Sequence, residues 1–75
     1  MPLKETVARN VRAEVARHGA NITQMAEQLS ISKQSASQKW RGNVPYSFDE
    51  LDLLAGWLEV SPETFVRLEH LSAAA

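Results

Sequence analysis

The sequence predicts an all-α fold, a single compact five-helix domain over residues 1–75. Three observations lead to this prediction. Apolar residues recur every three or four positions along successive segments, which is the period of one helix face. Residues that cap helix N-termini precede most of these segments, and Gly or Pro separates several of them. No segment shows a strand-like alternation of comparable strength.

The first two helices are predicted on either side of Gly19, which suits the residue that follows a helix. The first begins near Pro2 or Thr6. The second follows Asn21, which has the capping-box spacing to Gln24. The apolar stripe of the first helix is Leu3, Val7, Val11 and Val15, and that of the second is Ile22, Met25, Ala26 and Leu29.

The third predicted helix follows Ser32 as its N-cap and ends at Gly42. On it, Ala36 and Trp40 lie four residues apart, so both are expected to face the core. The loop after it contains Pro45, which a helix interior would not accept.

The last two helices begin at further capping signals. Ser47 and Glu50 form a second capping-box pattern, followed by the apolar set Leu51, Leu54, Ala55 and Leu58. Ser61 and Pro62 have the order of an N-cap and a first helical proline. The buried face of this fifth helix is predicted to be Phe65, Leu68 and Leu71.

The composition excludes several classes of protein. There is no Cys, so a disulfide scaffold and a Cys-ligated zinc site are excluded. His18 and His70 have no other ligand at metal-binding spacing, so we expect no metal site. Neither Ser35 nor Ser37 has a residue in the sequence that would activate it as a nucleophile, so we expect no enzymatic activity and no cofactor. No apolar run approaches the roughly 20 residues that span a bilayer. A cytoplasmic location is therefore expected, with no membrane partner and no small-molecule ligand.

Charge is distributed unevenly along the chain. The net charge is -1, but residues 1–42 contain seven Lys and Arg against three Asp and Glu, whereas residues 43–75 contain one against six. Such asymmetry favours a basic half that meets phosphates, although it also arises by chance on small domains.

Residues 21–42 carry the most functional information. Only Ser30, Ile31 and Ser32 separate the second and third helices, and so short a connection forces a steep crossing. The polar side chains of the third helix all donate hydrogen bonds and none is acidic, as a surface inserted into the DNA major groove requires. The residues expected to contact DNA are Ser32, Lys33, Gln34, Ser35, Ser37, Gln38, Lys39, Arg41 and Asn43.

Residues 21–42 resemble the helix-turn-helix of the Cro and phage-repressor (XRE) family, and residues 49–65 resemble its fourth and fifth helices. The resemblance implies a lambda-repressor-like domain in a bacterial cell, associated with the nucleoid. It also implies operator binding, with double-stranded DNA as the partner and usually a homodimer bound to it. We expect dimerisation within residues 61–72, through Phe65, Leu68 and Leu71.

Three positions depart from the family pattern. Ile22 stands where a phosphate-contacting Gln is common, and Ser30 replaces the turn glycine. Lys39 replaces an apolar residue, and Trp40 is expected to fill the space, which would leave Lys39 available to DNA. Gln34, near the N-terminal end of the third helix, is the first choice for a bidentate contact with adenine.

Two other interpretations stay open. The chain fits a DNA-binding antitoxin or another small bacterial regulator equally well. It also fits a protein-interaction module that has kept the fold and lost DNA binding, which the net charge of -1 and the absence of the phosphate-contacting Gln favour.

Overall fold

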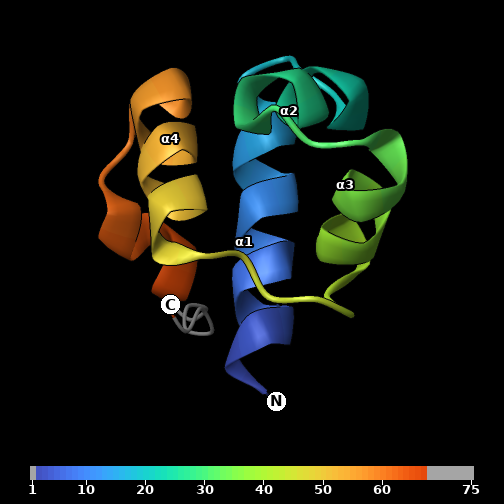
Figure 1. Cartoon of the computed structure of the whole chain (residues 1–75). Coiled ribbons are helices and arrows are strands. Elements are labelled where there is room, and N and C mark those ends of the chain that lie inside the picture. The colour runs from blue at the N-terminus through green and yellow to red at the C-terminus, as the bar shows by residue number, and fades with distance from the viewer. Residues whose placement is uncertain (1, 68–75) are drawn as a thin grey trace.

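The computed structural model describes residues 2–67, and all the regular secondary structure within them is helical. The elements are α1 (Leu3–Arg17), α2 (Ile22–Leu29), α3 (Lys33–Arg41), α4 (Phe48–Leu58) and a 3-10 helix, η1 (Pro62–Val66). Helix α1 occupies the centre, with α3 on one side and α4 and η1 on the other, while α2 lies near one end of α1 (Figure 1). Helix α1 packs against α3 and η1, and α2 packs against α3 and α4. The predicted all-helical fold is therefore confirmed for the described residues.

The predicted fifth α-helix is replaced by the shorter 3-10 helix η1 in the part that the structure describes. Its backbone becomes extended at Arg67, with φ -69° and ψ 132°. The Asn10 side-chain amide on α1 donates hydrogen bonds to the carbonyl oxygens of Phe65 and Arg67, both at 2.9 Å. These bonds satisfy carbonyls that an α-helix would pair with its own N–H groups. Leu68 and Leu71 lie outside the described residues.

The side-chain caps predicted at Asn21, Ser32 and Ser47 are present in the structure, whereas the Ser61 side chain makes no cap hydrogen bond at the start of η1. The Asn21 side chain accepts from the Gln24 backbone N–H at 2.9 Å, and the Gln24 side chain accepts from the Asn21 N–H at 3.0 Å. Ser47 and Glu50 make the same reciprocal pair at the start of α4. Both capping boxes are therefore confirmed, and they set the first residues of α2 and α4.

Every described helix contributes side chains to the core. Phe65 and Met25 are among its largest fully buried side chains, and Tyr46 from the α3–α4 loop is also buried. Trp40 is only half-buried, although it packs against the core as expected. Leu3, predicted to belong to the buried stripe of α1, is instead exposed, because in the first turn of α1 it borders an open hollow and is not covered by another element. The core includes Val7, Val11, Val15, Met25, Ala26, Leu29, Ala36, Leu51, Leu54, Ala55, Leu58 and Phe65.

Among residues 2–67, no helix combines the length and apolar character that a bilayer span needs.

Candidate nucleic-acid interface

The turn between α2 and α3 is built from three residues with distinct backbone conformations. Ser30 is left-handed, with φ 56° and ψ 44°, and its N–H donates to the Glu27 carbonyl at 3.2 Å. Ile31 packs against the core and donates its N–H to the Ala26 carbonyl at 3.1 Å. Ser32 is extended, and its hydroxyl oxygen accepts from the Ser35 N–H at 3.1 Å. The turn thus closes α2 and caps α3 within a few residues.

Helix α3 packs through small residues on its inner side. Ala36 is completely buried, and α3 contacts both α1 and α2. Gly42 ends the helix at φ 87°, where an added Cβ would lie 3.4 Å from Ala8 Cβ and from Glu5 Cα. A glycine therefore serves two needs at this point, the left-handed backbone and the close approach to α1.

The N-terminal end of α3 presents free polar side chains. Lys33, Gln34 and Ser35 are exposed, and their side chains have no hydrogen bond or ion pair within residues 2–67. Arg41, at the other end, is exposed and equally unpaired in the described part of the chain. These four side chains form what we term the exposed face of α3.

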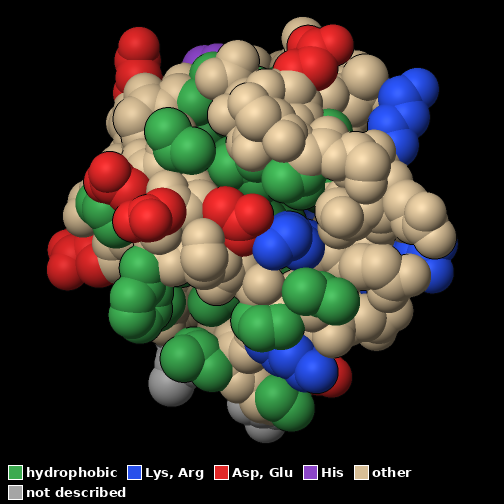
Figure 2. Space-filling model, in the orientation of Figure 1, with side chains coloured by type: hydrophobic (Ala, Val, Ile, Leu, Met, Phe, Trp, Pro, Cys, Tyr) green, Lys and Arg blue, Asp and Glu red, His purple; other side chains and the backbone are tan. Residues whose placement is uncertain are grey.

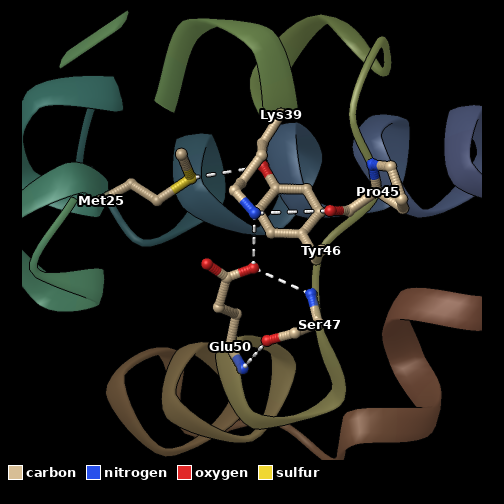
Figure 3. A network of polar contacts seen from close by, with 6 residues as sticks. All are labelled: Met25, Lys39, Pro45, Tyr46, Ser47 and Glu50. Atoms are coloured by element: carbon tan, nitrogen blue, oxygen red, sulfur yellow. Dashed lines mark hydrogen bonds and ion pairs between the residues drawn. The ribbon is translucent and has the colours of Figure 1, made fainter. Parts of the chain in front are cut away.

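Lys39 does not belong to that face, contrary to the sequence prediction. Its Nζ lies 2.8 Å from Glu50 Oε1, and the two side chains are only 14% and 16% exposed. The same Nζ lies 3.4 Å from the Pro45 carbonyl oxygen and 6.0 Å from the Tyr46 ring centre (Figure 3). Because its charge is already neutralised by a carboxylate, Lys39 ties α3 to α4 and is not available to phosphates.

The surroundings of this ion pair perturb two titrating groups. Burial acts to raise the pKa of Glu50, but hydrogen bonds from Lys39 and from Ser47 outweigh it, so the pKa lies below its ordinary value of 4.5. Burial raises the pKa of Tyr46, whose hydroxyl group donates to the Met25 sulfur at 3.4 Å. The surroundings therefore favour the ionised form of Glu50 beside Lys39 and the neutral form of Tyr46.

Further contacts anchor the C-terminal end of α3. A guanidinium nitrogen of Arg12, on α1, donates to the Trp40 carbonyl oxygen. The Asn43 side chain donates to Gln38 Oε1 at 3.1 Å, and Lys4 Nζ lies 3.3 Å from the Asn43 carbonyl oxygen. In the sequence, Arg12 is only one of the seven Lys and Arg residues of the basic half, residues 1–42, and no pattern predicts its partner. A tertiary contact to a main-chain carbonyl leaves no pattern in the sequence.

The other four residues predicted to contact DNA differ in how exposed they are. Ser32 and Asn43 are exposed, whereas Ser37 and Gln38 are half-buried. A hollow of about 230 Å³ separates the starts of α2 and α3, with Lys33 as the cation on its rim. Ile22, one of the positions at which the sequence departs from the Cro and phage-repressor pattern, also lines this hollow. The other lining residues are Thr23, Ala36 and Ser37.

The basic half of the sequence does not form one basic face. Arg9 and Arg17 line a groove of about 440 Å³ between α1 and η1, together with Arg67 from the acidic half. Arg17 is also paired with Glu14 at 2.7 Å. Acidic side chains gather mainly over α4, while Lys and Arg lie toward α3 and the lower centre of the same view (Figure 2). The charge asymmetry of the sequence therefore appears in the structure as a difference between α3 and α4. It does not produce one basic face, because Arg9 and Arg17 of α1 lie in the groove beside η1.

Two further predictions concern other sites. Phe65, one of the expected dimer contacts, is fully buried inside the chain, because η1 inserts it against α1 and α4, so it is not available to a partner. Leu68 and Leu71 lie beyond the described residues. Over residues 2–67, no group of three His, Cys, Asp or Glu side chains is placed to hold a metal ion.

Comparisons with known proteins return no relative. No protein-family model matches the chain, and neither a curated protein nor a solved structure matches it. The arrangement of its own residues is therefore what bears on its function.

Proposed function

We propose that this chain is a sequence-specific DNA-binding transcriptional regulator, a phage or prophage repressor or a Cro-like protein. In this proposal α2 and α3 form a helix-turn-helix, and α3 enters the major groove of an operator. One observation carries the proposal. The N-terminal end of α3, a helix without acidic residues, presents Lys33, Gln34 and Ser35 with no side-chain partner within residues 2–67, while its C-terminal end is fixed to α1 and α4.

Gln34 is the base-reading residue in this proposal. It is exposed in the first turn of α3, the end of a recognition helix that contacts base edges. Its amide both donates and accepts hydrogen bonds, which suits adenine N7 and N6. Gln38, one turn later, already accepts from Asn43 and is half-buried, so it is the weaker candidate.

Phosphate contacts are assigned to Arg41 and Lys33. Both are exposed and unpaired among the described residues, and both border α3, where the DNA backbone would run. Lys33, which lines the hollow together with Ile22, would supply a phosphate contact in place of the Gln that is common in the Cro and phage-repressor family at the position of Ile22. Ser32 and Asn43, exposed at the two ends of α3, complete the positioning contacts.

The proposal places the protein in the cytoplasm of a bacterial cell, bound to operator DNA as a homodimer. The resemblance of residues 21–42 to the Cro and phage-repressor family supports it. A DNA-binding antitoxin would use the same surface in the same way.

An interaction module without DNA binding is the second candidate. The pairing of Lys39 with Glu50 favours it, because it removes one cation from the side of α3. The position of Arg9 and Arg17 in the groove between α1 and η1 has the same effect, because it removes two more cations from the side of α3. The acid-free exposed face of α3 opposes it, since a surface that has lost its contact with phosphates gains nothing from excluding acidic residues.

The decisive experiment is a binding-site selection with three proteins, the wild type, Gln34→Ala and Gln28→Ala. Gln28 is a matched control, because it is exposed on α2 and has no partner in residues 2–67. Gln34→Ala is expected to lose about 1–3 kcal/mol on the selected site and to relax preference at one base pair. Non-specific binding should barely change, since it depends on phosphate contacts.

Two results would contradict the proposal at different levels. If the wild type selects no sequence and shifts no DNA from upstream of its own gene, the interaction module is the better account. If Gln34→Ala and Gln28→Ala select the same sequence with equal affinity, DNA binding stands but Gln34 does not read a base.

A further inference from the structure

Among residues 2–67, the largest exposed apolar side chain lies outside α3, at the start of α4. Phe48, the first residue of α4, is 91% exposed. It is one of the residues that line a hollow of about 260 Å³ with mostly apolar walls, to which α1, the α3–α4 loop, α4 and η1 all contribute. The walls include Leu3, Val7, Leu51 and Val66, of which Leu3 and Val66 are themselves exposed. Apolar side chains gather across the lower part of the face drawn in Figure 2.

Phe48 thus lines the hollow and is also almost fully exposed, and that arrangement suits a two-fold axis. In a symmetric pair, the same patch meets itself, so a protruding group beside a recess fills the partner's recess while its own is filled. A bulky aromatic seated in an apolar pocket is also the usual centre of a stable interface. We propose that this patch is where a second copy of the chain docks, with each Phe48 in the hollow of the other copy.

The charges at the rim support a second copy as the occupant. Lys4 borders the hollow, and Asp49 follows Phe48 and is exposed. Asp49 has no ion pair within the described residues, and Lys4 makes only an exposed contact to a carbonyl oxygen. When Phe48 enters the partner's hollow, Asp49 comes to the rim where the partner carries Lys4, and the symmetry makes this contact twice.

The same charges disfavour other occupants. Asp49 and Asp52 are both exposed around the start of α4, and their carboxylates would repel the phosphates of nucleic acid or of an anionic lipid surface. This surface also differs from the dimer contact expected from the sequence, in which Phe65 is buried and unavailable. The inference does not require DNA binding, and its test is performed without DNA.

The first test is sedimentation equilibrium of the full chain over a concentration series. The wild type is expected to show a monomer–dimer equilibrium, and Phe48→Glu to raise the dissociation constant by about thirtyfold or more. Leu53→Glu is the matched control, since Leu53 is 53% exposed on the same helix but does not line the hollow. It should leave the equilibrium unchanged. Because both side chains lie outside the core, circular dichroism should show wild-type helix content for both variants.

The second test exchanges the rim charges. Lys4→Glu and Asp49→Lys should each weaken self-association, because each creates two like-charge contacts in a symmetric dimer. A mixture of the two variants should associate again, since each contact then pairs opposite charges. A wild type that stays monomeric throughout the series would overturn the proposal. It would equally be overturned if Phe48→Glu behaved like Leu53→Glu, or if Leu68→Glu alone abolished the dimer.

Discussion

The two ends of α3 have opposite roles. At the N-terminal end, Lys33, Gln34 and Ser35 are exposed and make no side-chain contacts within residues 2–67. At the C-terminal end, Lys39 is paired with Glu50, and the Trp40 carbonyl accepts from Arg12. Both ends are rich in polar side chains, so composition does not distinguish them. The difference shows that a polar helix is divided into an anchoring part and a presenting part by the elements packed against it.

The largest effect is expected from removing the contact between α1 and the anchored end. Arg12→Ala should lower the free energy of unfolding by about 2 kcal/mol, because it removes a charged donor from the partly buried Trp40 carbonyl. Arg9→Ala is the control on the same helix, since Arg9 is exposed, and it should cost less than about 0.5 kcal/mol. Urea unfolding measures both variants. Equal values would show that Arg12 does not anchor α3.

A smaller effect is expected from the ion pair of Lys39 and Glu50. Lys39→Met should lower the free energy of unfolding by about 1–2 kcal/mol near pH 7, because Glu50 loses a charged hydrogen-bond partner. The folded-state pKa of Glu50 lies below its ordinary value of 4.5. Its contribution is therefore fully present above that pH and is lost as the pH falls through the lower folded-state pKa.

Unfolding measured between pH 3 and pH 7 checks the sign of this dependence. Glu50→Gln should flatten the loss of stability at acidic pH, whereas Glu27→Gln, at an exposed position without an ion pair among residues 2–67, should retain it. If the two variants lose stability equally on acidification, the ion pair does not contribute to anchoring.

The smallest effect concerns the residues that flank α3. Ser30 and Gly42 are both left-handed, at φ 56° and φ 87°. Ser30→Gly should stabilise the fold by about 0.5 kcal/mol, because relief of the left-handed strain exceeds the added entropy of glycine. Gly42→Ala should destabilise it by about 1 kcal/mol, since the new Cβ also approaches α1. Thermal unfolding compares the two, and a stabilising Gly42→Ala would contradict this account.

The sequence alone was sufficient to predict the four α-helices and their capping residues. Caps and periodicity are local signals, so Asn21 with Gln24 and Ser47 with Glu50 could be recognised from their spacing. These local signals do not show that the 3-10 helix η1 forms where a fifth α-helix was predicted. Its replacement by η1 involves Asn10, whose bonds to Phe65 and Arg67 join residues more than fifty positions apart.

The same difference between local signals and tertiary contacts applies to the candidate interface. The sequence determined that α3 would be polar and free of acidic residues, because this is a property of nine consecutive side chains. Only the tertiary structure determines which of these side chains have a hydrogen bond or ion pair and which have none within residues 2–67. Lys39 and Gln34 are both polar residues of one helix, but the start of α4 lies beside Lys39 and brings Glu50 to its ammonium group, whereas no described element covers Gln34. Whether a polar group is paired depends on what lies across from it in space, which the local sequence does not encode.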